Sequence, residues 1–115
     1  MFKMKPLFLV LARRPYDWFK KGFKKYELRE EKIKYNKDTV ISGRRVIVQR
    51  NQKNEGRFIG KIGKVKRGSL KFILNHVPFK QIVPPAKSKT EVIDIITKAG
   101  YIKNQNNCIA FEIKR

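Results

Sequence analysis

A short stretch near the start of the chain combines residue types that can do chemistry. Residues 22–29 follow the pattern G-x-K-x-x-E-x-R, with Lys24, Glu27 and Arg29 at the charged positions. If this stretch is a strand, Glu27 and Arg29 lie on one face, because residues two apart share a face. Lys24 precedes them closely enough to reach the same face. The spacing predicts a small polar site, and the alternative is a solvated strand face with an ordinary surface ion pair.

Lys24 and Glu27 could also act as a reactive pair. A lysine works as a nucleophile or base near neutral pH only when its pKa is lowered. Neighbouring positive charges lower a lysine pKa, and this chain is rich in them. Lys24 is therefore the residue expected to transfer a proton or attack, with Glu27 holding it in place. The residues alone leave open whether the protein is an enzyme.

The net charge is the strongest signal in the composition. The chain has 29 Lys and Arg residues against 9 Asp and Glu residues, a formal net charge of +20. The excess is spread over both halves of the sequence, so it belongs to the folded body and not to a basic tail. Such a field attracts polyanions, which indicates nucleic acid as the partner. The alternative is that the source organism simply favours lysine.

The length and the scarcity of cysteine and histidine exclude several classes of protein. A chain of 115 residues predicts a single domain spanning residues 1–115. With only Cys108 and His76, an internal disulfide and a Cys- or His-rich metal site are excluded, and no metal or cofactor is expected. A small domain without disulfides fits the reducing cytoplasm. No apolar run reaches the ~18 residues of a membrane span, so no membrane partner is expected, and a monomer is assumed.

Short strands and two helices are expected to position these residues. The apolar run Leu7–Leu11 predicts a first strand, and Pro15 and Gly22 delimit a short helix after it. Ser88 and Glu91 form a capping box before an amphipathic helix that ends at Gly100. Period-two patterns and turn residues predict further strands at 24–29, 44–50, 58–65, 70–74 and 108–113, and the loop 30–43 has room for a short strand at 39–41.

Closely spaced strands with turn signals between them favour a small, mostly antiparallel β-barrel of the α+β class, flanked by the two helices. The strand predicted at 58–65 contains Gly60 and Gly63. Glycines inside a strand indicate a bulge, a tight bend or a close approach of another backbone.

The motif at 22–29 resembles the signature of the ASCH domain family, which belongs to the PUA-like superfold. The similarity extends to the apolar first strand and to an Arg-Pro-aromatic sequence that opens the short helix, at Arg14, Pro15, Tyr16 and Trp18. It covers most of the chain, with residues 8–29 as its diagnostic part. The resemblance implies a small β-barrel whose cleft holds Lys24, Glu27 and Arg29.

ASCH domains are generally thought to bind RNA, so the resemblance implies RNA in preference to DNA. In this interpretation the motif contacts the nucleic acid inside the cleft, and basic side chains around it neutralise phosphates. Aromatic side chains near the cleft stack on a splayed base. The candidate binding residues are Lys24, Glu27, Arg29, Arg13, Arg14, Arg45, Tyr16 and Trp18.

Hydrolysis is the alternative that the resemblance keeps open. Some small bacterial ASCH proteins are amidohydrolases of N4-acetylcytidine, and a few others are described as ribonucleases. The amidohydrolases use a lysine at the position of Lys24, a threonine three residues later and a glutamate well downstream. Here Glu27 occupies the threonine position, and no acidic residue lies between Glu55 and Glu91. A third class, a module that binds an acidic protein, would need only the charge.

Overall fold

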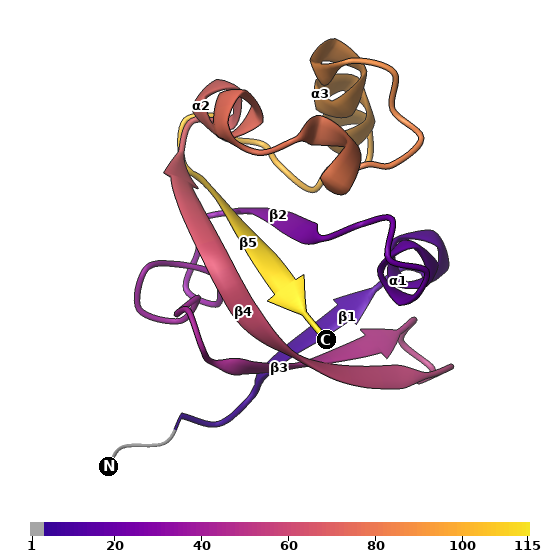
Figure 1. Ribbon diagram of the computed structural model, residues 1–115. Coiled ribbons are helices and arrows are strands. Elements are labelled where there is room, and N and C mark those ends of the chain that lie inside the picture. The colour runs from indigo at the N-terminus through magenta and orange to yellow at the C-terminus, as the bar shows by residue number, and fades with distance from the viewer. Residues whose placement is uncertain (1–3) are drawn as a thin grey trace.

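The chain folds around a five-stranded mixed sheet that forms an open half-barrel. The computed structural model describes residues 4–115, and its strand order is β1-β3-β4-β5-β2 (Figure 1). β1 lies parallel to β3, and the other neighbouring strands are antiparallel. The strands are β1 (Leu7–Leu11), β2 (Tyr26–Glu30), β3 (Arg45–Arg50), β4 (Arg57–Gly68) and β5 (Cys108–Lys114). The mostly antiparallel α+β prediction is confirmed, but within the described residues the edge strands β1 and β2 do not pair, so the barrel is not closed.

Within residues 4–115, three α-helices accompany the sheet, one more than predicted. They are α1 (Arg13–Lys20), α2 (Leu70–His76) and α3 (Lys89–Lys98), and a 3₁₀ turn, η1 (Phe79–Gln81), lies between the last two. In Figure 1, α2, η1 and α3 gather on one side of the sheet, whereas α1 lies next to the end of β1. None of the helices described is long and apolar enough to cross a bilayer.

The turn between α1 and β2 follows from Gly22. This glycine takes a left-handed conformation, with φ of 81°. The amides of Phe23 and Lys24 both donate to the carbonyl of Trp18, at 2.9 and 3.1 Å. The predicted helix and its glycine stop are confirmed. β2 begins only at Tyr26, however, so Lys24 lies in the turn before the strand and not in the strand itself.

The sheet buries one apolar cluster on each face. The interior of the half-barrel holds residues such as Leu9, Val48 and Phe111, and the opposite face packs against α2 and α3. β5 supplies both clusters: Ile109, Phe111 and Ile113 point into the half-barrel, and Cys108 and Ala110 face the helices. The alternation predicted for this strand is confirmed. Burial, helped by nearby carboxylates, raises the pKa of Cys108 to about 11, which suits a structural thiol.

The predicted strand at 70–74 is wrong, because these residues form α2. Ser69 caps the helix, and its hydroxyl accepts a hydrogen bond from the Phe72 amide at 3.0 Å. Leu70, Ile73 and Leu74 are buried together, as the i, i+3, i+4 spacing of one helix face requires. A short apolar run has the same pattern in a strand and in a buried helix, and here the capping serine distinguishes them.

The short strand considered at 39–41 is also wrong, because Asn36 organises this segment as a turn. The Asn36 side-chain oxygen accepts from the Asp38 amide at 2.8 Å, and the Thr39 hydroxyl accepts from the Asn36 amide at 2.9 Å. These local side-chain bonds replace the pairing that a strand would need.

β4 passes close to β5 at its two inner glycines. The register between the strands shifts between Ile62 and Val65, which places an irregularity at Gly63. A Cβ atom at Gly60 would lie 2.7 Å from the carbonyl oxygen of Lys114. The sequence-based expectation of a bulge and a close backbone approach is therefore confirmed at these positions.

Gly60→Ala should destabilise the protein by about 1–3 kcal/mol, because the added methyl group meets the main chain of β5. Ile59→Ala is a matched control, since Ile59 is 63% exposed in the same strand. The control should change the free energy of unfolding by less than about 0.5 kcal/mol. Urea unfolding of both variants measures the difference, and equal effects would contradict the close approach.

Candidate functional site

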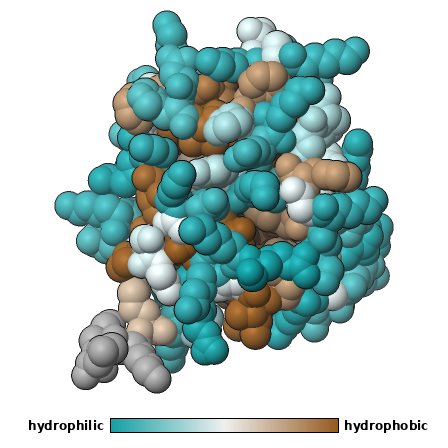
Figure 2. Space-filling view, viewed as in Figure 1, coloured by the Kyte–Doolittle hydropathy of each residue, from teal (hydrophilic) through white to brown (hydrophobic). Residues whose placement is uncertain are grey.

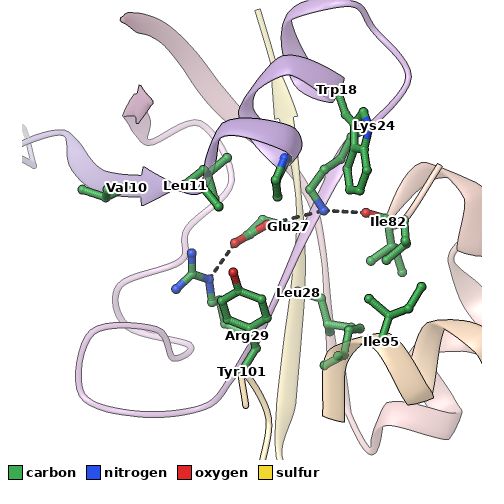
Figure 3. A pocket seen from close by; sticks show the side chains of 14 residues that line it. Val10, Leu11, Trp18, Lys24, Glu27, Leu28, Arg29, Ile82, Ile95 and Tyr101 are labelled. Atoms are coloured by element: carbon green, nitrogen blue, oxygen red, sulfur yellow. Dashed lines mark hydrogen bonds and ion pairs between the residues drawn. The ribbon is translucent and has the colours of Figure 1, made fainter. Parts of the chain in front are cut away.

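A pocket occupies the gap between the two edge strands. Val10 and Leu11 of β1 line one side, and Glu27, Leu28 and Arg29 of β2 line the other (Figure 3). The cavity has a volume of about 180 Å³. The other walls come from α1 and the residues on either side of it, from the segment after η1, and from α3 and the residues that follow it. These lining residues are Ala12, Pro15, Trp18, Lys24, Ile82, Val83, Ile95, Ile96 and Tyr101. The pocket exists because the half-barrel is open at this point.

The three charged motif residues form a row along one wall. Glu27 stands in the middle, with its Oε1 3.4 Å from Lys24 Nζ and its Oε2 2.7 Å from Arg29 Nε. Lys24 and Glu27 are each only 6% exposed. The structure thus brings together the residues that the spacing singled out, and it buries them. Two cations share one carboxylate, which leaves the row with one net positive charge.

Lys24 also fastens the turn before β2 to the segment after η1. Its Nζ donates to the carbonyl of Ile82 at 2.6 Å and lies 5.3 Å from the ring centroid of Phe19. The amide of the next residue, Lys25, donates to the carbonyl of Gln81 at 2.8 Å. Burial lowers the pKa of Lys24, and the Glu27 carboxylate opposes that shift. The lowering was expected from neighbouring charges, but desolvation is its main cause.

Arg29 offers free hydrogen-bond donors at the other end of the row. Its Nε donates to Glu27, and its guanidinium carbon lies 5.0 Å from the ring centroid of Tyr35. Within residues 4–115, its two terminal nitrogens have no hydrogen-bond partner. Since Arg29 lines the pocket, these nitrogens can donate to a ligand there.

The free edge of β2 adds main-chain groups to the pocket. In an antiparallel pair, every second residue hydrogen-bonds to the neighbouring strand. The Lys25 carbonyl accepts from the Ile113 amide, and the Glu31 amide donates to the Asn107 carbonyl. Glu27 and Arg29 lie between these two at the same spacing, so their main chains also turn toward β5. The N–H and C=O of Leu28 therefore point away from β5, at the edge where Leu28 lines the pocket. A donor and an acceptor thus lie beside the charged row.

The other sequence-predicted residues are distributed unequally around this pocket. Trp18 lines it, but Tyr16 is buried in the half-barrel and packs against Phe58, with ring centroids 5.4 Å apart, so it presents no free ring face. Arg13 and Arg14 line a shallower groove that adjoins the pocket. Arg45 is exposed on β3 and lines neither hollow.

Tyr101 and Ile82 are residues of this site that the sequence analysis missed. Tyr101 is 51% exposed and directly follows Gly100, whose φ of 76° ends α3 as predicted. Ile82 contributes both its side chain and the carbonyl that binds Lys24. Nothing local in the sequence relates these residues to the motif. Within residues 4–115 no three His, Cys, Asp or Glu residues are grouped to hold a metal ion.

Solved structures of low sequence identity share this fold. The chain is similar to hypothetical protein PH0355 (TM-score 0.72, 19% identity, over 93% of this chain and 95% of that chain). It is also similar to protein PF0455 from Pyrococcus furiosus (TM-score 0.67, 17% identity, 96% of each chain) and to ASCH from Zymomonas mobilis (TM-score 0.65, 12% identity, 94% of this chain and 66% of that chain). The sequence matches no protein-family model, and no curated protein is significantly similar to it. The fold that the motif predicted, that of an ASCH protein, is confirmed.

Glu27→Gln should destabilise the protein by about 3–5 kcal/mol, because it leaves two cations buried without their counter-charge. Glu31→Gln is the control: Glu31 pairs with Arg67 near the surface, and such pairs contribute about 0–1 kcal/mol. Chemical denaturation of the two variants gives the comparison. Similar losses in both would show that burial of the row is not important for stability.

Lys24→Met should remove one component of the pH dependence of stability. Because burial lowers the folded pKa of Lys24 below 10.5, the unfolded chain binds this proton more tightly. The contribution of Lys24 to the free energy of unfolding therefore rises with pH between the folded pKa and 10.5. Urea unfolding at a series of alkaline pH values gives the free energy of unfolding of the wild type and of Lys24→Met. The wild-type free energy minus that of the variant should rise with pH. A flat difference would contradict the lowered pKa of Lys24.

Proposed function

We propose that residues 1–115 form one nucleic-acid-binding domain, which prefers single-stranded RNA and takes one unstacked base into the pocket between β1 and β2. The observation that carries this proposal is a largely apolar cavity with unpaired donors and an acceptor on a single wall. An apolar cavity of about 150 Å³ holds benzene, so a cavity of about 180 Å³ suits one heterocyclic base. Proteins read unpaired RNA bases by stacking and by hydrogen bonds to base edges.

Each polar group of the pocket has a separate role in this proposal. The free guanidinium nitrogens of Arg29 donate to the base or to its phosphate. The N–H and C=O of Leu28 bind the base edge, as a neighbouring strand would. Trp18 supplies an aromatic wall. Lys24 and Glu27 already bind each other, so they act mainly by orienting Arg29.

The surface charge supports a polyanionic ligand. Hydrophilic residues cover most of the face seen in Figure 2, with hydrophobic residues visible in the hollows between them. The net charge of +20 favours binding to phosphates of any sequence, in a salt-dependent way. The ASCH-type fold, which the resemblance associates with RNA, supports the same ligand class.

Fluorescence anisotropy tests the proposal with single-stranded RNA, duplex RNA and duplex DNA at two salt concentrations. Single-stranded RNA should bind most tightly, and Arg29→Gln should weaken it by about 1.5–3 kcal/mol, the value of a hydrogen bond to a charged group. Arg45→Gln is the control with the same charge change outside the pocket. It should weaken all three ligands alike. Equal losses in both variants, or equal affinity for all ligands, would show that the surface charge alone binds.

Hydrolysis of an amide on a modified base is a second candidate, favoured by the lowered pKa of Lys24 inside the pocket. In that reaction the neutral Lys24 amine takes a proton from water, and the water oxygen bonds to the carbonyl carbon. The amide C–N bond then breaks as Lys24 returns its proton to the leaving nitrogen, which releases a carboxylic acid and the amino base.

Incubation with N4-acetylcytidine and with RNA separates the two candidates. Pure binding predicts unchanged nucleoside and intact RNA on a gel. Release of cytidine by the wild type, and its loss in Lys24→Arg, would instead establish the hydrolase. Lys24→Arg keeps a positive charge but cannot become a neutral amine at any pH used for proteins.

A further inference from the structure

A groove continues from the pocket onto the surface of the protein. Ala12, Pro15, Trp18 and Tyr101 line both hollows, so the two share a wall and are not separate sites. Arg13 and Arg14, which follow β1 in sequence, and Asn51 complete the lining of the groove. A ligand bound in the pocket can therefore extend directly into the groove.

The two arginines of the groove have different partners. Arg13 donates to both carboxylate oxygens of Glu55, each at 2.7 Å, and this contact lowers the pKa of Glu55 to about 2. Arg14 instead has its guanidinium carbon 5.6 Å from the ring centroid of Trp18. No carboxylate of residues 4–115 pairs with it. Arg14 is thus a cation whose donors are available to an anion.

Tyr101 offers a partly free ring where the pocket and the groove meet. Its side chain is 51% exposed, and Figure 3 shows it beside Arg29. Trp18, on the Lys24 side of the pocket, is partly covered by Arg14. An exposed aromatic ring close to an unpaired arginine is the combination that single-stranded nucleic acids bind, by stacking and by phosphate contact.

We propose that the groove binds the nucleotide adjacent to the one in the pocket, so that the ligand is recognised as a dinucleotide. The phosphate between the two nucleotides binds Arg14, and the second base stacks on Tyr101. This inference rests on the proposed function, because it requires a base in the pocket. It adds a second subsite and assigns Tyr101 as a binding residue.

Titration calorimetry with a mononucleotide, a dinucleotide and a trinucleotide of one RNA base tests this inference. Affinity should rise by about tenfold or more from one nucleotide to two, as expected for one stacked base, and much less from two to three. Arg14→Gln should abolish the first increase while leaving mononucleotide affinity nearly unchanged, because Arg14 lines the groove and not the pocket. Tyr101 lines both hollows, so Tyr101→Leu is judged by the ratio of dinucleotide to mononucleotide affinity, which should fall close to one. Both positions are exposed enough for the variants to fold.

Arg13→Gln is the matched control, since it removes the same charge from the neighbouring position. It should retain the increase from one nucleotide to two, because Glu55 already occupies Arg13. The inference is overturned if the mononucleotide binds as tightly as the dinucleotide, or if Arg13→Gln and Arg14→Gln behave alike. Failure of the proposed function looks different: Arg29→Gln would then leave the affinity unchanged at every ligand length.

Discussion

The buried pairing of Glu27 with Lys24 and Arg29 is the interaction on which the rest of the site depends. Charges withdrawn from water are stable only when they are paired and hydrogen-bonded. The register of β2 with β5 puts Glu27 and Arg29 on the inner face of the sheet, and the Gly22 turn brings Lys24 to them. Lys24 Nζ also donates a hydrogen bond to the carbonyl of Ile82. The row therefore fixes α1, β2 and the segment after η1 relative to one another.

The opening of the half-barrel is what turns this row into part of a site. If β1 and β2 paired, the N–H and C=O of Leu28 would hydrogen-bond to β1, and no cavity would remain beside them. Unpaired strand edges are a liability for association between chains. Here residues of α1 and α3 line the same gap, so these edges are partly covered.

The sequence predicts the parts of this structure that depend on local spacing. Glu27 and Arg29 share a face because strand side chains alternate, and the glycine after α1 marks the turn that carries Lys24. The apolar run at 70–74 is ambiguous at this level, since its burial fits either kind of element. Tyr101 and Ile82 reach the pocket only through the packing of the C-terminal half, and the open edge depends on which distant strands pair. Neither the position of these two residues nor the open edge is marked by a local pattern in the sequence.

Internal pairing within the row has a kinetic consequence for a polyanionic ligand. The row of Lys24, Glu27 and Arg29 contributes only one unit to the net charge of +20. The long-range field therefore comes from the rest of the surface. Association is accelerated by that field and slows as salt screens it. Dissociation of a base from the pocket depends on contacts beside the buried row, where screening is weaker. Salt should therefore slow capture of the ligand more steeply than it shortens the time that a base stays in the pocket.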